Sequence, residues 1–152
     1  MIHLPEAFIS QTKSLLGLEE TEALIKALSE EAPTSIRVNP NKATAISGES
    51  VPWCETGYYL SERPSFTLDP LFHAGAYYVQ EASSMFLSQV IKALPEEPRR
   101  VLDLCAAPGG KSTLWRAELP EQTLLVANEP IHRRAMILAE NLAKWGHQDV
   151  IV

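Results

Sequence analysis

The chain has 152 residues, of which 45% are hydrophobic and 21% charged, and its formal net charge is −6. This composition is that of a globular protein, and the length allows one ordinary domain or two small ones. No apolar run approaches the roughly 20 residues that a membrane-spanning helix needs, and the segment Met1–Pro5 lacks the basic start and apolar core of a signal peptide. Two cysteines are too few for a disulfide framework. We therefore expect a cytoplasmic protein with no membrane association, and the negative charge argues mildly against a nucleic-acid partner.

The first part of the chain predicts a small α/β domain over residues 1–70. Apolar residues recur at helical spacing in its first half, and short alternating segments bounded by turn residues follow. In chain order the expected elements are helices at 5–16 and 19–31 separated by Gly17, then strands at Ser35–Val38, Val51–Trp53 and Gly57–Leu60.

Residues 71–152 predict alternating helices and strands, beginning with a helix at 82–94. The later elements are strands at Val101–Leu104, Thr123–Ala127 and Asp149–Val152, with helices from Ser112 to about Glu118 and from Pro130 to Trp145. Right-handed crossovers would join the three strands into a parallel sheet. The unbroken apolar run Thr123–Ala127 is typical of a strand covered on both faces. We expect Pro130 at the first helical position and Gly146 as the C-terminal stop.

The segment from Val101 to Thr113 is the most informative part of the sequence. It combines a short buried strand, a turn containing Gly109 and Gly110, and the start of a helix. Glycines let a ligand approach the backbone closely, and the amide N–H groups at the helix N-terminus point toward the same place. This arrangement predicts a cofactor-binding loop.

Two common cofactor motifs match this loop poorly. A phosphate-binding P-loop needs a glycine five residues before Gly110, where the chain has Cys105, although Gly110-Lys111-Ser112 fits the end of that motif. A dinucleotide fold needs Gly-x-Gly-x-x-Gly, but here two glycines are adjacent and the third is missing. A nucleotide hydrolase and a dehydrogenase are therefore the weaker interpretations.

S-adenosyl-L-methionine fits the loop better, because it has no phosphate but has an amino-acid end and a ribose diol. Turn amides and a carboxylate can hold the amino-acid end of the cofactor. An acidic residue after the second strand can accept hydrogen bonds from the ribose hydroxyls. Glu129 lies at that place, about 20 residues beyond the glycines, as in other βαβ units. Simpler roles are also open: Glu129 as an acid that stabilises the following helix, Asp103 as a brace for the loop, and Lys111 as a solvated residue.

The run from Asp103 to Ser112 resembles the cofactor motif of the Sun/Nop family of RNA cytosine-5 methyltransferases, and most closely the bacterial enzymes that act on small-subunit ribosomal RNA. Other segments resemble the family in the same order: Ser35–Asn39, Gly75–Ser84, and Ala127–Glu129 followed by Arg133, Asn141 and Trp145-Gly146. The resemblance covers nearly the whole chain. It implies an α/β fold in two parts. Residues 71–152 would form the first three strands, with their helices, of a Rossmann-like class I methyltransferase sheet. An N-terminal α/β domain, which helps to bind RNA, would precede them.

The same resemblance implies the site residues. S-adenosyl-L-methionine would be held by Glu129 at its ribose and, on its methionine side, by Cys105, Ala106, Ala107, Pro108, Gly109, Gly110 and Lys111. The resemblance implies RNA, namely ribosomal RNA, as the partner. Arg37, Asn39 and Lys42 are candidates for contact with it, although each suits a surface turn equally well. No metal is expected, and the oligomeric state is left open.

The chain departs from the family in its catalytic cysteines. The family attacks carbon 6 of cytosine with a cysteine thiolate, which is covalent catalysis, and its two cysteine motifs follow the fourth and fifth strands. Neither motif occurs here, and we interpret Cys105 as part of the cofactor motif and Cys54 as structural. We therefore expect the N-terminal part of such an enzyme, inactive alone and weak in cofactor binding. The alternative is a non-catalytic RNA- or protein-interaction module that keeps the fold.

Overall fold

The structure is a computed structural model that describes residues 3–42, 46 and 48–152. The structure does not describe residues 1–2, 43–45 and 47. The predictions about the signal peptide and the 1–70 domain therefore lie outside the described residues where they concern these positions. The chain forms two compact units, Met1–Pro33 and Thr34–Val152. Within the described residues, no helix combines the length and apolar character needed to cross a membrane. The predicted domain boundary near residue 70 stays a prediction.

The first unit is a pair of helices, α1 (Glu6–Leu16) and α2 (Leu18–Leu28), joined at Gly17. Gly17 has φ +85°, a left-handed conformation that glycine adopts without strain. The Thr21 hydroxyl donates to the Gly17 carbonyl at 2.6 Å, which fixes the start of α2. Both predicted helices are confirmed, and the second ends at Leu28 rather than at residue 31.

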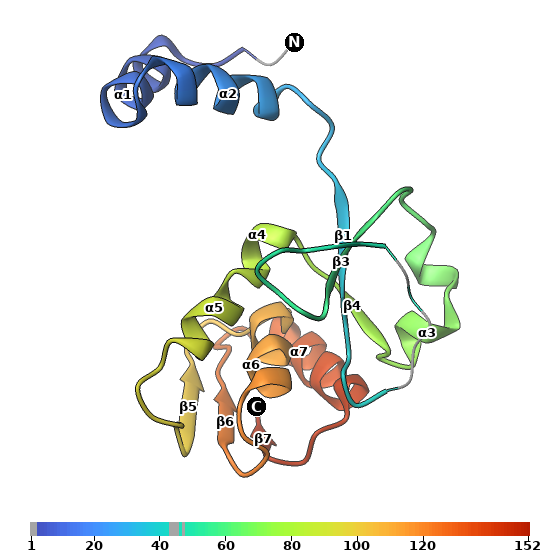
Figure 1. Cartoon of the computed structure of the whole chain (residues 1–152). Coiled ribbons are helices and arrows are strands. Elements are labelled where there is room, and N and C mark those ends of the chain that lie inside the picture. Colours follow the sequence, from blue (N-terminus) through green and yellow to red (C-terminus); the bar gives the residue numbers. More distant parts are fainter. Residues whose placement is uncertain (1–2, 43–45, 47) are drawn as a thin grey trace. The chain divides into compact units, whose positions relative to one another are not determined.

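The second unit contains an antiparallel sheet in the order β2-β3-β1-β4 (Figure 1). Its strands are β1 (Thr34–Val38), β2 (Glu49–Ser50), β3 (Gly57–Leu60) and β4 (Tyr77–Val79), and η1 (Phe66–Leu68) and α3 (Pro70–His73) precede β4. The predicted strands at Ser35–Val38 and Gly57–Leu60 are confirmed. The predicted strand Val51–Trp53 is wrong, because Cys54 N donates to Val51 O and closes a turn there. The strand β4 was not predicted, since three residues are too few to show alternation.

The predicted three-stranded parallel sheet is confirmed in the second unit, and its strand order is β5-β6-β7 (Figure 1). Its strands are β5 (Arg100–Asp103), β6 (Leu124–Ala127) and β7 (Val150–Ile151), and its crossover helices are α6 (Gly110–Glu118) and α7 (His132–Trp145). The predicted coverage of the strand Thr123–Ala127 is complete on one face only: Leu125 and Ala127 are fully buried, but Leu124 and Val126 are partly exposed. Helices α6 and α7 pack on one face only, above a core of alanines and leucines that includes Ala106, Ala127 and Leu138.

Two helix predictions need correction. The predicted helix at 82–94 is two short helices, α4 (Ala82–Met85) and α5 (Leu87–Lys92), because the turn tightens at Phe86, whose N–H donates to Ser83 O. Phe86 is 55% exposed, so the predicted apolar face is not wholly buried. Pro130 lies before α7 rather than at its first position, since Ile131 is the N-cap. Gly146 ends α7 with φ +87°, as predicted.

Candidate cofactor site

The candidate site begins with the loop between β5 and α6. Asp103, the last residue of β5, braces it: one carboxylate oxygen accepts from the Ser112 hydroxyl at 2.8 Å and the other from the Cys105 N–H at 3.3 Å. Ser112 is fully buried, so the first of these bonds is shielded from water. Asp103 therefore acts as the brace that the sequence left open, and it ties the strand end to the first turn of α6.

Gly109 sets the direction in which α6 begins. It is the N-cap of the helix with φ +113°, and its N–H donates to Ala106 O at 2.8 Å. Ala106 in turn donates to Asn128 O at 3.0 Å, which joins the loop to the segment after β6. The N–H groups of Gly110, Lys111 and Ser112 have no hydrogen-bond partner within the described part of the chain. These are the groups that a helix N-terminus offers to the carboxylate end of a ligand.

Gly110 lies against a second layer of side chains behind the loop. A Cβ at this position would be 3.3 Å from Tyr78 Cε1 and 3.5 Å from the Gln80 amide nitrogen. Both residues come from β4 or the residue after it, so the antiparallel sheet backs the loop directly. A larger residue at 110 would therefore displace the loop or Tyr78.

Glu129 lies at the same edge of the parallel sheet as the loop. Its side chain is 3% exposed; one oxygen accepts from the Ile131 N–H at 3.0 Å and the other is 3.4 Å from the Arg134 guanidinium. Arg134 also donates to Ala107 O at 3.0 Å and so bridges Glu129 and the loop. These contacts fit the simpler alternative, in which Glu129 is an acid that stabilises the start of the following helix. The role of Glu129 toward a ribose stays a prediction.

Arg134 is the site residue that the sequence reasoning missed. Its signal was available, since it follows Glu129 by five positions at the start of α7, within reach of the same sheet edge. Asn128 was also not assigned a role, although its side-chain amide donates to Leu104 O at 2.9 Å.

The remaining predicted residues divide by exposure. Ala106, Ala107 and Gly109 are buried, so they contribute backbone only. Cys105, Pro108 and Lys111 are exposed. The Pro108 carbonyl accepts from the Asn141 amide at 2.7 Å, which ties the loop to α7.

Arg37 and Asn39 are not surface residues, because each is 0% exposed. Arg37 donates to the Gln80 amide oxygen at 2.9 Å and to the Thr113 hydroxyl at 2.6 Å, and its guanidinium lies 4.5 Å from the centre of the Trp145 ring. Burial lowers the pKa of Arg37 to about 10. The alternative of a surface turn residue is therefore wrong for both, and their role toward RNA stays a prediction.

Asn39 and Lys42 act on the end of α7. The Asn39 amide donates to Gly75 O at 3.0 Å and to Trp145 O at 2.9 Å, and Lys42 Nζ donates to Lys144 O at 2.5 Å. A cation and an amide donor at a helix C-terminus satisfy its free carbonyls and favour its dipole. Lys42 is half-buried, and its role toward RNA stays a prediction.

Two protein-family models match this chain. Residues 4–82 match the model of the N-terminal domain of 16S rRNA methyltransferase RsmF, and residues 90–152 match that of 16S rRNA methyltransferase RsmB/F. The chain belongs to the RsmB/F family. A ribosomal RNA small subunit methyltransferase F of Aliivibrio fischeri is 33% identical over 98% of this chain and 35% of its own length. This RsmB/F-family chain thus spans about a third of the length of that curated relative.

Solved structures support the fold of this RsmB/F-family chain. A methyltransferase homologue from Pyrococcus horikoshii has a TM-score of 0.80 and 28% identity, over 97% of this chain and 52% of its own. NSun6 from Pyrococcus horikoshii, solved with SFG, has a TM-score of 0.75 over 97% of this chain and 64% of its own, and at 17% identity it shows the fold alone. The Rossmann-like methyltransferase fold and the family resemblance are therefore confirmed.

Proposed function

We propose that this chain is the cofactor-binding part of an S-adenosyl-L-methionine-dependent RNA cytosine-5 methyltransferase that acts on small-subunit ribosomal RNA. The observation that carries the proposal is that Arg134 contacts both Glu129 and the Ala107 carbonyl, so Glu129 lies beside the loop. At the end of that loop the N–H groups of Gly110 to Ser112 have no partner among the described residues. Membership of the RsmB/F family supplies the substrate class.

The residues present fit the cofactor. The free N–H groups at the start of α6 would bind its carboxylate, and Cys105 to Lys111 would line its methionine side. Glu129 would accept from its ribose hydroxyls, for which its ion pair with Arg134 must loosen, because the carboxylate is 3% exposed. When bound, the cofactor supplies the methyl group; this chain's own part is to bind and orient it.

The nucleophile is not assigned to this chain. Cys54 is 1% exposed and lies in the core with Val51 and Met85, so no base can reach it. Cys105 is exposed but belongs to the loop, where its N–H is held by Asp103. We infer that methyl transfer needs the two cysteine motifs of the family, and that this chain alone transfers no methyl group.

The test is an NMR titration of the 152-residue chain with S-adenosylhomocysteine to millimolar concentration, since binding is expected to be weak. The amide signals of Gly109 to Ser112 should move and saturate. Gly110→Arg should abolish binding, and Glu129→Gln should weaken it about tenfold, the order of one hydrogen bond to a charged group. Glu140→Gln, an exposed acid on α7, is the control and should change nothing. A folded chain whose loop signals stay fixed refutes cofactor binding and favours the non-catalytic interaction module.

A further inference from the structure

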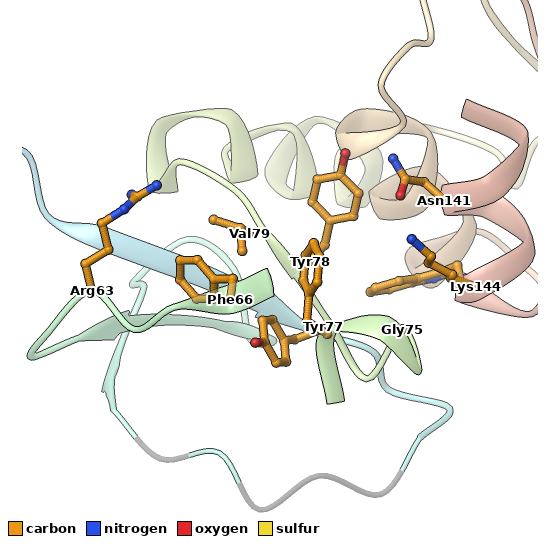
Figure 2. Close-up of a pocket in the computed structure, with 10 residues that line it drawn as sticks. Arg63, Phe66, Gly75, Tyr77, Tyr78, Val79, Asn141 and Lys144 are labelled. Atoms are coloured by element: carbon orange, nitrogen blue, oxygen red, sulfur yellow. The ribbon is translucent and has the colours of Figure 1, made fainter. Parts of the chain in front are cut away.

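A hollow lined by aromatic side chains lies next to the loop between β5 and α6 (Figure 2). It has a volume of about 280 Å³ and is formed by η1, α3, β4 and the last turns of α7. Phe66, Phe72 and Tyr77 form one side, with ring centres 6.0 to 6.4 Å apart. Sites for drug-sized ligands span about 300 to 1,000 Å³, so this hollow suits a smaller flat group.

Two cations lie on opposite sides of the hollow (Figure 2). Arg63 is exposed, with its guanidinium 5.7 Å from the centre of the Phe66 ring, and Lys144 Nζ is 5.9 Å from the centre of the Phe72 ring. Glu140 pairs with Lys144 at 2.7 Å, and Asp69 accepts from the Tyr77 hydroxyl. These acids partly balance the positive charge, so Arg63 is the principal cation for an anionic ligand.

Trp145, one of the residues that line the hollow, has an unsatisfied hydrogen-bond donor that lies just beneath the surface of the hollow. Trp145 is 3% exposed and lines the hollow, and its Nε1–H has no partner among the described residues. A buried donor without an acceptor costs about 1 to 3 kcal/mol. The Tyr78 hydroxyl, on the same wall, also has no partner in the described part of the chain, and burial raises its pKa, so it remains a neutral donor.

The hollow is separate from the predicted cofactor residues but touches their loop. None of its lining residues belongs to Cys105–Lys111 or is Glu129. Asn141 lines the hollow and donates to Pro108 O at 2.7 Å, and the Tyr78 ring lies against Gly110. A ligand held here is therefore adjacent to the cofactor loop without occupying it.

We propose that this hollow binds one unstacked base of a single-stranded RNA segment, with Arg63 on the adjoining phosphate and with a small turn of the buried Trp145 ring that lets its Nε1–H donate to the base. Single-stranded RNA is recognised in this way, by bases splayed onto aromatic rings and by hydrogen bonds to base edges. The inference rests on the proposed function, which supplies RNA as the substrate class, and adds to it a specific pocket for a base other than the one that reacts.

The experiment follows the tryptophan indole N–H signals of the 152-residue chain during titration with a hexacytidine RNA at low salt. The Trp145 signal, assigned with Trp145→Phe, should shift, while that of Trp53 should stay fixed because its Nε1–H already donates to Ala82 O at 2.6 Å. Arg63→Gln and Trp145→Phe should each weaken binding about fivefold. Arg99→Gln removes another exposed positive charge, away from the hollow, and should change affinity less than twofold.

Three results would overturn the proposal: no binding of the oligonucleotide, equal binding of an abasic hexamer with the same phosphates, or equal losses in Arg63→Gln and Arg99→Gln. Displacement of the RNA by S-adenosylhomocysteine would assign the hollow to the cofactor instead. The loop amides and the Trp145 indole report separately, so a failure of cofactor binding is distinguishable from a failure of the base pocket.

Discussion

Arg37 and Thr113 are 76 positions apart in the sequence, yet the Arg37 guanidinium donates to the Thr113 hydroxyl at 2.6 Å inside the protein. The same guanidinium donates to Gly110 O at 3.4 Å, so a residue of the antiparallel sheet holds the first turn of α6. The loop that we propose to bind the cofactor is thus positioned from outside its own sheet.

Lysine should not be able to replace the guanidinium of Arg37, which donates to both Gln80 and Thr113. Lysine keeps the charge but cannot reach Gln80 and Thr113 together, so Arg37→Lys should lower the free energy of unfolding by about 2–4 kcal/mol. Urea unfolding measures this loss. Arg133→Lys, on an exposed residue of α7, should change stability by less than about 0.5 kcal/mol. Equal stabilities of the two variants would contradict the positioning role.

Gly75 should tolerate no side chain. It has φ +66°, and a Cβ would lie 2.1 Å from Lys144 O, a backbone atom that cannot move aside. Gly75→Ala should therefore cost more than about 3 kcal/mol. Gly17→Ala is the control that measures backbone strain without a clash, because Gly17 has φ +85° and a Cβ there would meet no atom within 4 Å. This variant should lower the free energy of unfolding by only about 1–2 kcal/mol. Thermal or urea unfolding of both variants would show the difference, and equal losses would exclude the clash.

Ser112→Ala should loosen the brace of the loop. It removes the donor to Asp103 from a fully buried site and should cost about 1–2 kcal/mol. We also expect weaker binding of S-adenosylhomocysteine, measured by the loop amide titration. The matched variant is Ser83→Ala on α4, an exposed serine, which should leave both quantities unchanged. Unchanged stability of Ser112→Ala would show that the brace does not hold the loop.

Stability should fall as the pH drops below the ordinary pKa of histidine, in part because of His147. Burial, followed by the charge of Arg116, lowers the pKa of His147, and its Nδ1 accepts from the Asp149 N–H at 3.3 Å. The unfolded chain then binds a proton more readily than the folded one, so this contribution is fully present above about pH 6.5 and is lost as the pH falls toward the lowered value. His147→Gln should flatten the difference between urea unfolding at pH 5.5 and pH 7.5. A variant with the parent's full pH dependence would exclude His147 as the source.

The sequence by itself determined the parallel sheet, the glycine turn between β5 and α6, and the family. Local signals sufficed for these, since apolar runs marked β5 and β6, adjacent glycines marked the turn, and Gly146 marked the end of α7. Strand β4 and the break at Phe86 left no such signal, because each depends on neighbours distant in the chain.

Only the tertiary structure decided the roles of Arg37, Asn39 and Arg134. In the sequence Arg37 and Asn39 are polar residues beside a turn, and polarity there predicts exposure. Their burial depends on partners at Thr113, Gly75 and Trp145, whose closeness comes from the packing of two sheets around α6 and α7. Burial of a charge is acceptable only when such partners satisfy it, and no local pattern of residues contains that information.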